Sequence, residues 1–147
     1  FVADEISAYA FFGNQKRYSR LQNKRIGRKV IISSNIKSDT KEDIVVNYQS
    51  LINRGYKYFE NSTIMLLSLL KRINPSKIVI AGFDGFREDS EKNYSDSSFQ
   101  NERHKGEFAI LNKEVAEMFR NIAEIMSPTC KIELITPSLY EEAIRDV

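Results

Sequence analysis

The chain has 147 residues, of which 41% are hydrophobic, and these values are typical of one domain with a single buried core. Its 22 lysine and arginine residues nearly balance 20 aspartate and glutamate residues, so the net charge of +2 favours neither nucleic acid nor a membrane surface as a partner. The single cysteine cannot form an internal disulfide, and the sequence has no Cys/His cluster for zinc. We therefore expect a cytoplasmic protein with no metal bound in this domain.

Apolar runs alternate with helical patterns along the chain. Short β-branched or aromatic runs predict strands at residues 8–14, 30–35, 44–51, 77–84 and 131–136. Apolar spacing of three and four residues, together with helix start and stop signals, predicts helices at residues 15–25, 61–73 and 107–126. The polar stretch at residues 86–104 predicts a long loop, and a short helix or tail is expected after Pro137.

This alternation predicts an α/β layer architecture with a mostly parallel sheet, because a parallel connection needs a helix that crosses a sheet face. All 147 residues are expected to form one domain. Ligands of such sheets bind beyond the carboxyl ends of the strands, so this edge is where a site is expected.

Hydrogen-bonding side chains dominate the ends of the predicted strands and the start of the helix at residues 61–73. The candidate ligand-binding residues are Asn14, Ser34, Asn35, Asn47, Asn61, Ser62 and Asp84. The free N–H groups at that helix start would suit a phosphate or another anion. Because the set has many hydrogen-bonding groups and few catalytic ones, it favours binding of a polar ligand such as a nucleotide or sugar.

Each of these residues also has a purely structural interpretation. Asn14 and Asn35 suit tight turns, and Asn61 with Ser62 suits a helix cap. Asp84 lies between glycines at the end of an apolar run, where a buried carboxylate would lose its hydration unless a donor compensates it. The sequence leaves a turn and a ligand equally open for Asp84.

His104 is the only histidine and lies in the predicted polar loop. Its ordinary pKa suits a general base, although a histidine in a loop is more often simply solvated. The sequence contains none of the glycine-rich dinucleotide, P-loop, zinc-protease or nucleophile-elbow motifs. The known motifs therefore assign no catalytic residue.

Several segments together resemble the C-terminal domain attached to certain bacterial aldolases, which are related to 4-hydroxy-2-oxovalerate aldolase and HMG-CoA lyase. The resemblance covers nearly the whole chain and is carried by AYAFFGNQKRYSRL, VIISSNI, VVNYQSLI, ENSTIMLLSLLKRINPSKIVIAGFDGF and KIELITPSLY. It implies a Rossmann-like three-layer sandwich, which follows a metal-dependent TIM barrel in the longer protein. The aldolase chemistry and its divalent metal would then belong to that barrel, and this domain would need no cofactor.

The family's domain usually opens with a strand and a G-P-G-x-S turn, which this sequence lacks. The resemblance therefore implies that the first strand lies upstream of residue 1 or was not included. The absence of an initial Met and of a positively charged leader agrees with an internal start and not with a signal peptide. The longest apolar stretch, residues 64–70, is far shorter than the roughly 20 residues that span a bilayer, so no membrane segment is expected.

A fainter similarity links the chain to bacterial sialyltransferases of glycosyltransferase family 42. Those proteins share a helix that begins with Ser, a strand that ends in S-G-I-D and a histidine ahead of the last helix, and the counterparts here are Ser62, residues 81–84 and His104. This similarity implies a cytidine nucleotide site with His104 as the base. Three hypotheses follow: an accessory domain that binds a nucleotide or sugar-nucleotide beside an N-terminal aldolase barrel, a glycosyltransferase, or a docking and oligomerisation domain.

Overall fold

The structure is a computed structural model. It describes residues 8–21, 29–38, 40, 41, 43–87 and 106–147. The strands are β1 (Tyr9–Phe12), β2 (Lys29–Ser33), β3 (Ile44–Val46), β4 (Lys77–Ile80) and β5 (Lys131–Leu134). The helices are α1 (Gln15–Leu21), α2 (Ser62–Ile73) and α3 (Glu107–Met126), with short 3₁₀ helices at Tyr48–Ser50 and Glu141–Ala143.

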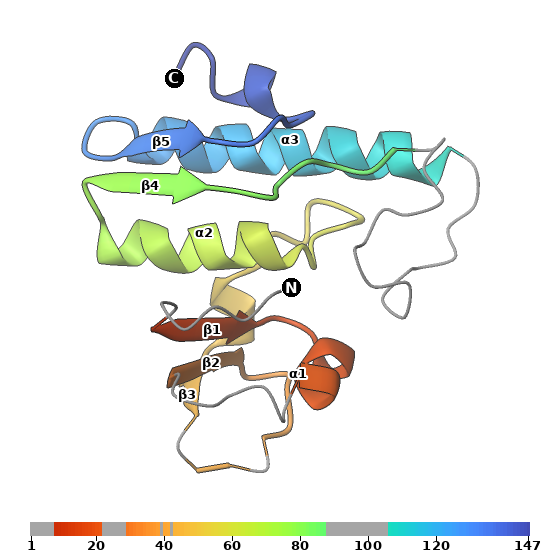
Figure 1. The fold of residues 1–147 in the computed structure, drawn as a ribbon. Helices are drawn as coiled ribbons and strands as arrows, with labels where there is room; N and C mark the ends of the chain where they lie inside the picture. The colour runs from red at the N-terminus through yellow and green to blue at the C-terminus, as the bar shows by residue number, and fades with distance from the viewer. Residues whose placement is uncertain (1–7, 22–28, 39, 42, 88–105) are drawn as a thin grey trace.

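The expected strands and helices are present in the expected order (Figure 1). Residues 22–25, the end of the first predicted helix, lie outside the described residues. The strand predicted at residues 44–51 is shorter than expected, because the chain turns into a 3₁₀ helix after Asn47. The Asn47 side chain accepts a hydrogen bond from the Gln49 N–H and caps this helix. The loop predicted at residues 86–104 lies mostly outside the described residues.

The strands form two parallel sheets. One has the order β1-β2-β3, in which Ala10 pairs with Val30 and Ile31 pairs with Ile44. The other contains β4 and β5, in which Ile78 pairs with Ile132. The expected α/β class with parallel strands is therefore confirmed, and the fold is Rossmann-like with small sheets. It differs from a single sheet because β1 and β4 do not pair within the described part of the chain.

Helix α2 has well-defined ends. Asn61 accepts hydrogen bonds from the N–H groups of Thr63 and Ile64, and this cap satisfies donors that have no partner within the helix. At the other end Asn74 adopts the left-handed conformation, with φ of 53°, and its N–H bonds to the Leu70 carbonyl. The sequence therefore fixes this helix locally, before any tertiary contact is considered.

Two hydrophobic clusters hold the layers together. The larger cluster joins α2, α3, β4, β5 and the C-terminal segment; it includes Leu67, Phe83 and Phe119. The smaller one packs α1 on the β1–β3 sheet, where Phe12 meets the ring of Tyr18 edge-on at 5.6 Å. Apolar faces of both helices and strands are buried in this way, as layered α/β folds require.

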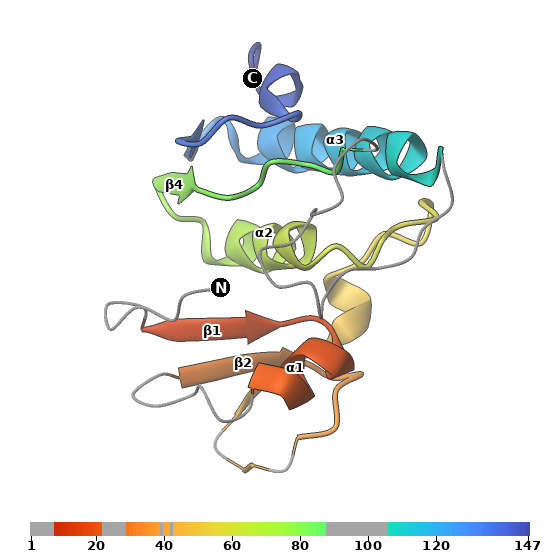
Figure 2. The same cartoon turned by 45° about the vertical axis from the view of Figure 1, so that its right-hand side comes forward.

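Helices cover both faces of β1. Phe12 points to Tyr18 of α1, whereas the next residue, Gly13, lies against α2. A β-carbon on Gly13 would be only 2.7 Å from the Met65 sulfur, so Gly13 permits the close approach of α2 to this sheet. When the molecule is turned, α2 and α3 shift relative to β4, which shows that these helices form a layer separate from the strands (Figure 2).

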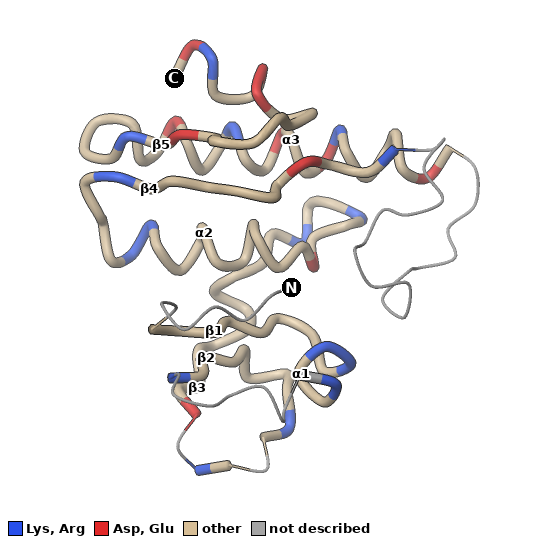
Figure 3. Tube along the Cα trace, viewed as in Figure 1, with Lys and Arg blue, Asp and Glu red and all other residues tan. Residues whose placement is uncertain are grey.

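Charged residues are spread over the described surface (Figure 3). Basic residues gather on α1, which contains Lys16, Arg17 and Arg20, while α3 carries both acidic and basic residues. None of the helices among the described residues combines the length and the apolar character needed to cross a bilayer.

Candidate functional site

The strands of both sheets run in the same direction in Figures 1 and 2. Their carboxyl ends therefore lie on the same side of the molecule, where a ligand of a parallel α/β sheet is expected. The candidate residues are distributed over three places on this side: the loops after β1, β2 and β3, the start of α2, and the loop after β4. The structure records no hydrogen bond between Asp84 and any of the candidate asparagines among the described residues.

Asn14 and Asn47 each act as a cap. The Asn14 side-chain oxygen accepts hydrogen bonds from the N–H groups of Lys16 at 2.9 Å and Arg17 at 3.3 Å. Asn47 accepts from Gln49 at 3.0 Å. Each of these two side-chain oxygens is therefore used within the protein, because it holds the first turn of a helix. For Asn14 this differs from the tight turn that the sequence suggested.

Ser34 and Asn35 follow β2, and Ser34 connects this end to the segment after β3. The Ser34 hydroxyl accepts a hydrogen bond from the Tyr48 N–H at 3.0 Å, and Asn35 accepts from the Ser33 hydroxyl at 2.5 Å. Ser33 is completely buried. These contacts set the shape of the loops after the two strands, and they leave the Asn35 amide nitrogen with no described partner.

The start of α2 offers little room for an anion. Asn61 already accepts from the N–H groups of Thr63 at 3.0 Å and Ile64 at 3.1 Å. Only the Ser62 N–H, among the first three of this helix, has no acceptor in the described part of the chain. The phosphate site expected here is thus reduced to one free backbone donor and the Ser62 hydroxyl.

Asp84 is exposed, so the expectation that burial would strip this carboxylate of its hydration is wrong. One carboxylate oxygen accepts a hydrogen bond from the Thr136 hydroxyl at 3.4 Å, and the other has no partner among the described residues. Gly82 and Gly85 have φ values of 70° and 88°, which side chains rarely adopt. The glycines therefore serve the turn, while the carboxylate they frame remains available to a ligand.

The loop that carries Asp84 is held firmly by its neighbours. The Asn112 side chain of α3 accepts from the Phe86 N–H at 3.0 Å and donates to the Phe86 carbonyl at 2.6 Å. The Asp84 carbonyl accepts from the Leu139 N–H at 3.0 Å. A fixed loop costs a ligand less conformational entropy on binding than a mobile one.

Sequence reasoning missed the part that the segment after β5 plays in this site. The Thr136 hydroxyl accepts from the Gly82 N–H at 2.9 Å and faces Asp84, and the Ser138 hydroxyl donates to the Phe83 carbonyl at 2.5 Å. The signal was present in the sequence, since Thr136 ends a predicted strand and Ser138 follows two residues later. In a parallel sheet their carboxyl-end position places them beside the β4 loop.

A buried polar group in the β1–β3 region was also missed. The Tyr18 hydroxyl donates to the Asp43 carboxylate at 2.7 Å and lies 3.0 Å from the Ser38 hydroxyl, which itself donates to Asp43 at 2.6 Å. Tyr18 is only 1% exposed. These contacts tie α1 to the loop after β2. The two hydroxyls and the carboxylate find hydrogen-bond partners in one another, so we interpret the group as structural.

Tyr48 has a perturbed ionisation. Partial burial, followed by its hydrogen bond to the Glu60 carboxylate, raises the pKa of the Tyr48 hydroxyl from 10.0 to about 12. The hydroxyl is therefore a stable proton donor to Glu60 at neutral pH. It links the 3₁₀ helix after β3 to the segment that leads into α2.

His104 lies outside the described residues, so its predicted role as a base stays a prediction. Among the described residues, no group of three or more His, Cys, Asp or Glu side chains is placed to hold an ion. The described site thus consists of hydrogen-bonding groups.

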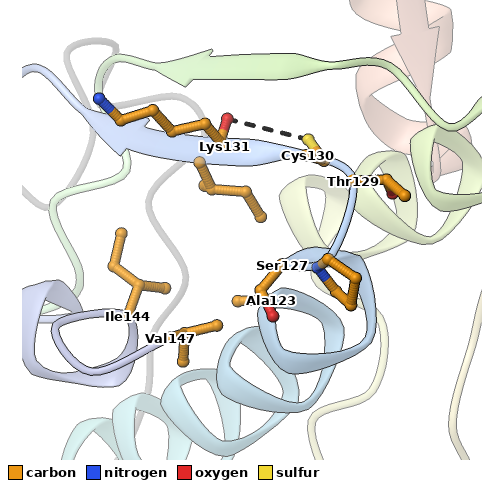
Figure 4. Close-up of a pocket in the computed structure, with 9 residues that line it drawn as sticks. Ala123, Ser127, Thr129, Cys130, Lys131, Ile144 and Val147 are labelled. Atoms are coloured by element: carbon orange, nitrogen blue, oxygen red, sulfur yellow. Dashed lines mark hydrogen bonds between the residues drawn. The ribbon is translucent and has the colours of Figure 1, made fainter.

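A cavity of about 440 Å³ opens elsewhere, beside the α3–β5 connection (Figure 4). It is lined by Ala123, Ser127, Pro128, Thr129, Cys130, Lys131, Ile132, Ile144 and Val147. The Cys130 thiol is buried and lies 3.8 Å from the Lys131 carbonyl oxygen. Because Lys131 begins β5, the cavity lies at the amino end of this strand and contains none of the candidate residues.

Comparison with known proteins adds no relative. No family model matches the chain, and no curated protein or solved structure does so either. The resemblance to the domain attached to bacterial aldolases and the fainter one to family 42 sialyltransferases both stay predictions. The class that the fold itself defines is a small, Rossmann-like α/β domain with parallel strands.

Proposed function

We propose that residues 1–147 form the accessory C-terminal domain of an aldolase-type protein and bind a nucleotide or sugar-nucleotide at the carboxyl edge of β4 and β5. The observation that carries the ligand proposal is the exposed Asp84 carboxylate, one oxygen of which has no partner among the described residues. An ionised carboxylate is an acceptor only, so it would take hydroxyl groups of a ribose or another sugar. The divalent metal and aldolase chemistry would belong to the preceding barrel.

Three further features support a ligand beside Asp84. Gly82 is exposed and has no atoms within 4 Å of where a β-carbon would be, so a ligand could approach its backbone closely. The Thr136 hydroxyl lies beside the carboxylate and adds a second polar group. Asn112 fixes the loop through both hydrogen bonds to Phe86. Few, firmly placed polar groups of this kind orient small polar ligands.

The same proposal places the protein in the cytoplasm. Cys130 is a free thiol and is buried in the core, where it behaves as a small hydrophobic residue. An unpaired cysteine suits a reducing compartment. The proposal names no nucleic acid or membrane partner, because positive and negative charges are nearly balanced.

Thermal unfolding with added CMP, CDP, UMP and UDP tests the ligand. A nucleotide whose free concentration is about 100 times its dissociation constant would stabilise the folded chain by about 2.7 kcal/mol and raise Tm. Asp84→Ala should abolish the shift, while Asp146→Ala, which removes an exposed carboxylate from the C-terminal end, should leave it unchanged. If no nucleotide raises Tm, or if Asp84→Ala retains the full shift, the ligand proposal is wrong and the docking hypothesis takes its place.

A further inference from the structure

Charge is distributed unevenly along the chain. Residues 8–51, within which β1, α1, β2 and β3 lie, contain nine lysines and arginines against three aspartates and glutamates, a net charge of +6. The rest of the chain has a net charge of −4. Basic segments predominate around α1 and the β1–β3 sheet in Figure 3. The near neutrality of the whole chain therefore does not describe this region, and a local surface of one sign attracts ligands of the other sign.

The excess is densest in residues 15–29, QKRYSRLQNKRIGRK. These fifteen residues contain seven basic side chains and no acidic one. Four of the seven are arginines, whose planar guanidinium forms paired hydrogen bonds with phosphate oxygens. Sequences so rich in lysine and arginine are typical of surfaces that bind nucleic acids. Of this stretch the structure describes α1 and Lys29.

Helix α1 carries two of these cations on its outer side. Tyr18 is only 1% exposed, and its ring meets Phe12 of the sheet. Lys16 and Arg20 lie two positions before and after Tyr18, and successive helix residues are rotated by about 100°, so both project away from the sheet. Both are exposed, and their separation of four residues makes them neighbours on the helix surface.

A third cation is held next to α1. The Gln15 side chain accepts a hydrogen bond from the Lys37 N–H at 2.8 Å and donates to the Lys37 carbonyl at 3.5 Å, so it fastens the loop after β2 to the first turn of the helix. Lys16 and Lys37 are exposed, and neither forms an ion pair within the described part of the chain. Exposed ammonium groups of this kind suit phosphate oxygens.

The basic surface extends along the length of the sheet. Helix α1 follows the carboxyl end of β1, whereas Lys29 begins β2 at the opposite end, and the four residues of β1 separate these ends by about 13 Å, at about 3.3 Å per residue. At the Lys29 end the ring of Tyr9 is 54% exposed, and the Lys29 ammonium lies 5.9 Å from the centre of this ring. Side chains alternate along β1, so Tyr9 points to the sheet face opposite Phe12 and α1. A ligand that contacts both α1 and Tyr9 must therefore be extended and must pass over the amino end of the sheet.

We propose that this region binds single-stranded nucleic acid, with Lys16, Arg20, Lys29 and Lys37 at its phosphates and a base stacked on Tyr9. Proteins that bind single strands combine a basic surface along the backbone with exposed aromatic rings for the bases. The surface is separate from Asp84, and this inference does not depend on the ligand proposed there.

Other polyanions fit these features less well. A helix that binds a membrane buries an apolar face in the lipid, but the Tyr18 side of α1 is already buried against the sheet. The carboxylates of an acidic protein would meet the cations, whereas the bases of a nucleic acid also use the exposed Tyr9 ring. The combination of phosphate and planar base therefore accounts for more of the surface.

Fluorescence anisotropy of the 147-residue chain with labelled single-stranded RNA and DNA of about 12 nucleotides tests the proposal. At about 50 mM salt the double substitution Lys16→Gln with Lys37→Gln should weaken binding by about tenfold or more. It should also reduce the slope of log K against log salt by about 1.4, because each phosphate contact with a single strand contributes about 0.7. Tighter binding of RNA or of DNA identifies which of the two the surface prefers.

The matched control is Arg72→Gln with Lys113→Gln. Both residues are exposed, on α2 and α3, and this pair lowers the net charge from +2 to zero as the first pair does. Affinity should change by less than about twofold and the salt slope should stay the same, because these charges lie outside the basic surface. Unchanged Tm values for both double variants would show that neither pair unfolds the chain.

Tyr9 tests the stacking separately. Tyr9→Ala should weaken binding by about fivefold or more, whereas Tyr9→Phe keeps a ring and should bind as the parent does. Asp84→Ala should leave oligonucleotide binding unchanged, so failure of this proposal and failure of the nucleotide proposal are distinguishable.

Absence of oligonucleotide binding at about 50 mM salt would overturn the inference, as would equal effects of the two double variants. Parent-like binding by Tyr9→Ala, or tighter binding of a duplex than of its single strands, would contradict the single-stranded ligand. Binding of phosphatidylserine vesicles or polyglutamate as tightly as the oligonucleotides would show a surface that does not distinguish nucleic acid from other polyanions, and the inference would then be wrong.

Discussion

The two sheets of this domain have cores of very different size. Among the described residues, the β4–β5 sheet shares a cluster of thirteen buried residues with α2, α3 and the C-terminal segment, whereas the cluster of the β1–β3 sheet contains five. Buried apolar area is the main favourable term in folding, so the first region should be much the more stable. The β1–β3 region therefore depends more on other contacts, namely the Tyr18 hydrogen bonds and the packing of Met65 on Gly13.

The largest expected effect is in the large core. Phe119 is completely buried and meets the Phe83 ring edge-on at 5.4 Å, so Phe119→Ala should lower the free energy of unfolding by about 3–5 kcal/mol. Urea denaturation measures this change. Ile125→Ala on the same helix is the control, with an expected change within about 0.5 kcal/mol, because its side chain is 61% exposed. Equal losses for the two variants would contradict the assignment of this core.

A smaller, local effect is expected in the β1–β3 region. Tyr18→Phe removes the hydroxyl that donates to Asp43 and leaves that part-buried carboxylate short of a donor, at a cost of about 1–3 kcal/mol. Hydrogen exchange should accelerate in β1 and β2 more than in α3. Tyr9→Phe, at a tyrosine that is 54% exposed, should leave both regions unchanged. A uniform acceleration throughout the molecule would show that the two regions unfold together, and the expected difference in their stability would then be wrong.

The smallest effect is expected at the ion pairs that join β4 and β5. Glu133 lies 2.6 Å from Lys131 and 2.7 Å from Lys77, and hydrogen bonds from these lysines, that from Lys131 first, lower the pKa of its carboxyl from 4.5 to about 2. The resulting stability is present above pH 4.5 and is lost as the pH falls towards 2. Glu133→Gln should therefore lower Tm slightly at pH 7 and low salt, and the difference from the parent should vanish near pH 2.

Thermal scans at pH 7 and pH 2, each at low and high salt, measure this difference. Glu124→Gln is the control, because Glu124 is exposed on α3 and no ion pair is recorded for it among the described residues. If the Glu133→Gln difference persists unchanged at pH 2, the charge of Glu133 is not its cause. The effect is expected to be small because exposed ion pairs are screened by water and salt.

The local elements were largely predictable from the sequence. The α3 stripe and its end before Pro128 gave a helix at residues 107–126, and the structure has the same bounds. Asn61 and Pro75 bracketed α2 correctly, because capping and helix-breaking act over a few residues. The third strand was predicted too long. Asn47 ends it by capping the 3₁₀ helix that follows, but in the sequence this residue cannot be told from any other polar residue of a strand.

The site was less predictable. The sequence identified Asp84 as a candidate but suggested a buried carboxylate, whereas the structure leaves it exposed. Thr136 enters the site from a segment about fifty residues away; the sequence places it at the end of a predicted strand, but only the pairing of β5 with β4 brings it beside Asp84. The cap formed by Asn61 matches the structural alternative that the sequence left open. Asn14 caps a helix where the sequence suggested a tight turn, and the cap formed by Asn47 was not expected.

By itself the sequence determined the α/β class, the direction of the strands and the bounds of the main helices, because periodicity and capping depend on residues near each other in the chain. Only the tertiary structure decided that the strands divide into two sheets within the described residues and that Asp84 meets Thr136. These features depend on which distant surfaces come together, and many sequences with the same local pattern would allow different pairings of strand edges.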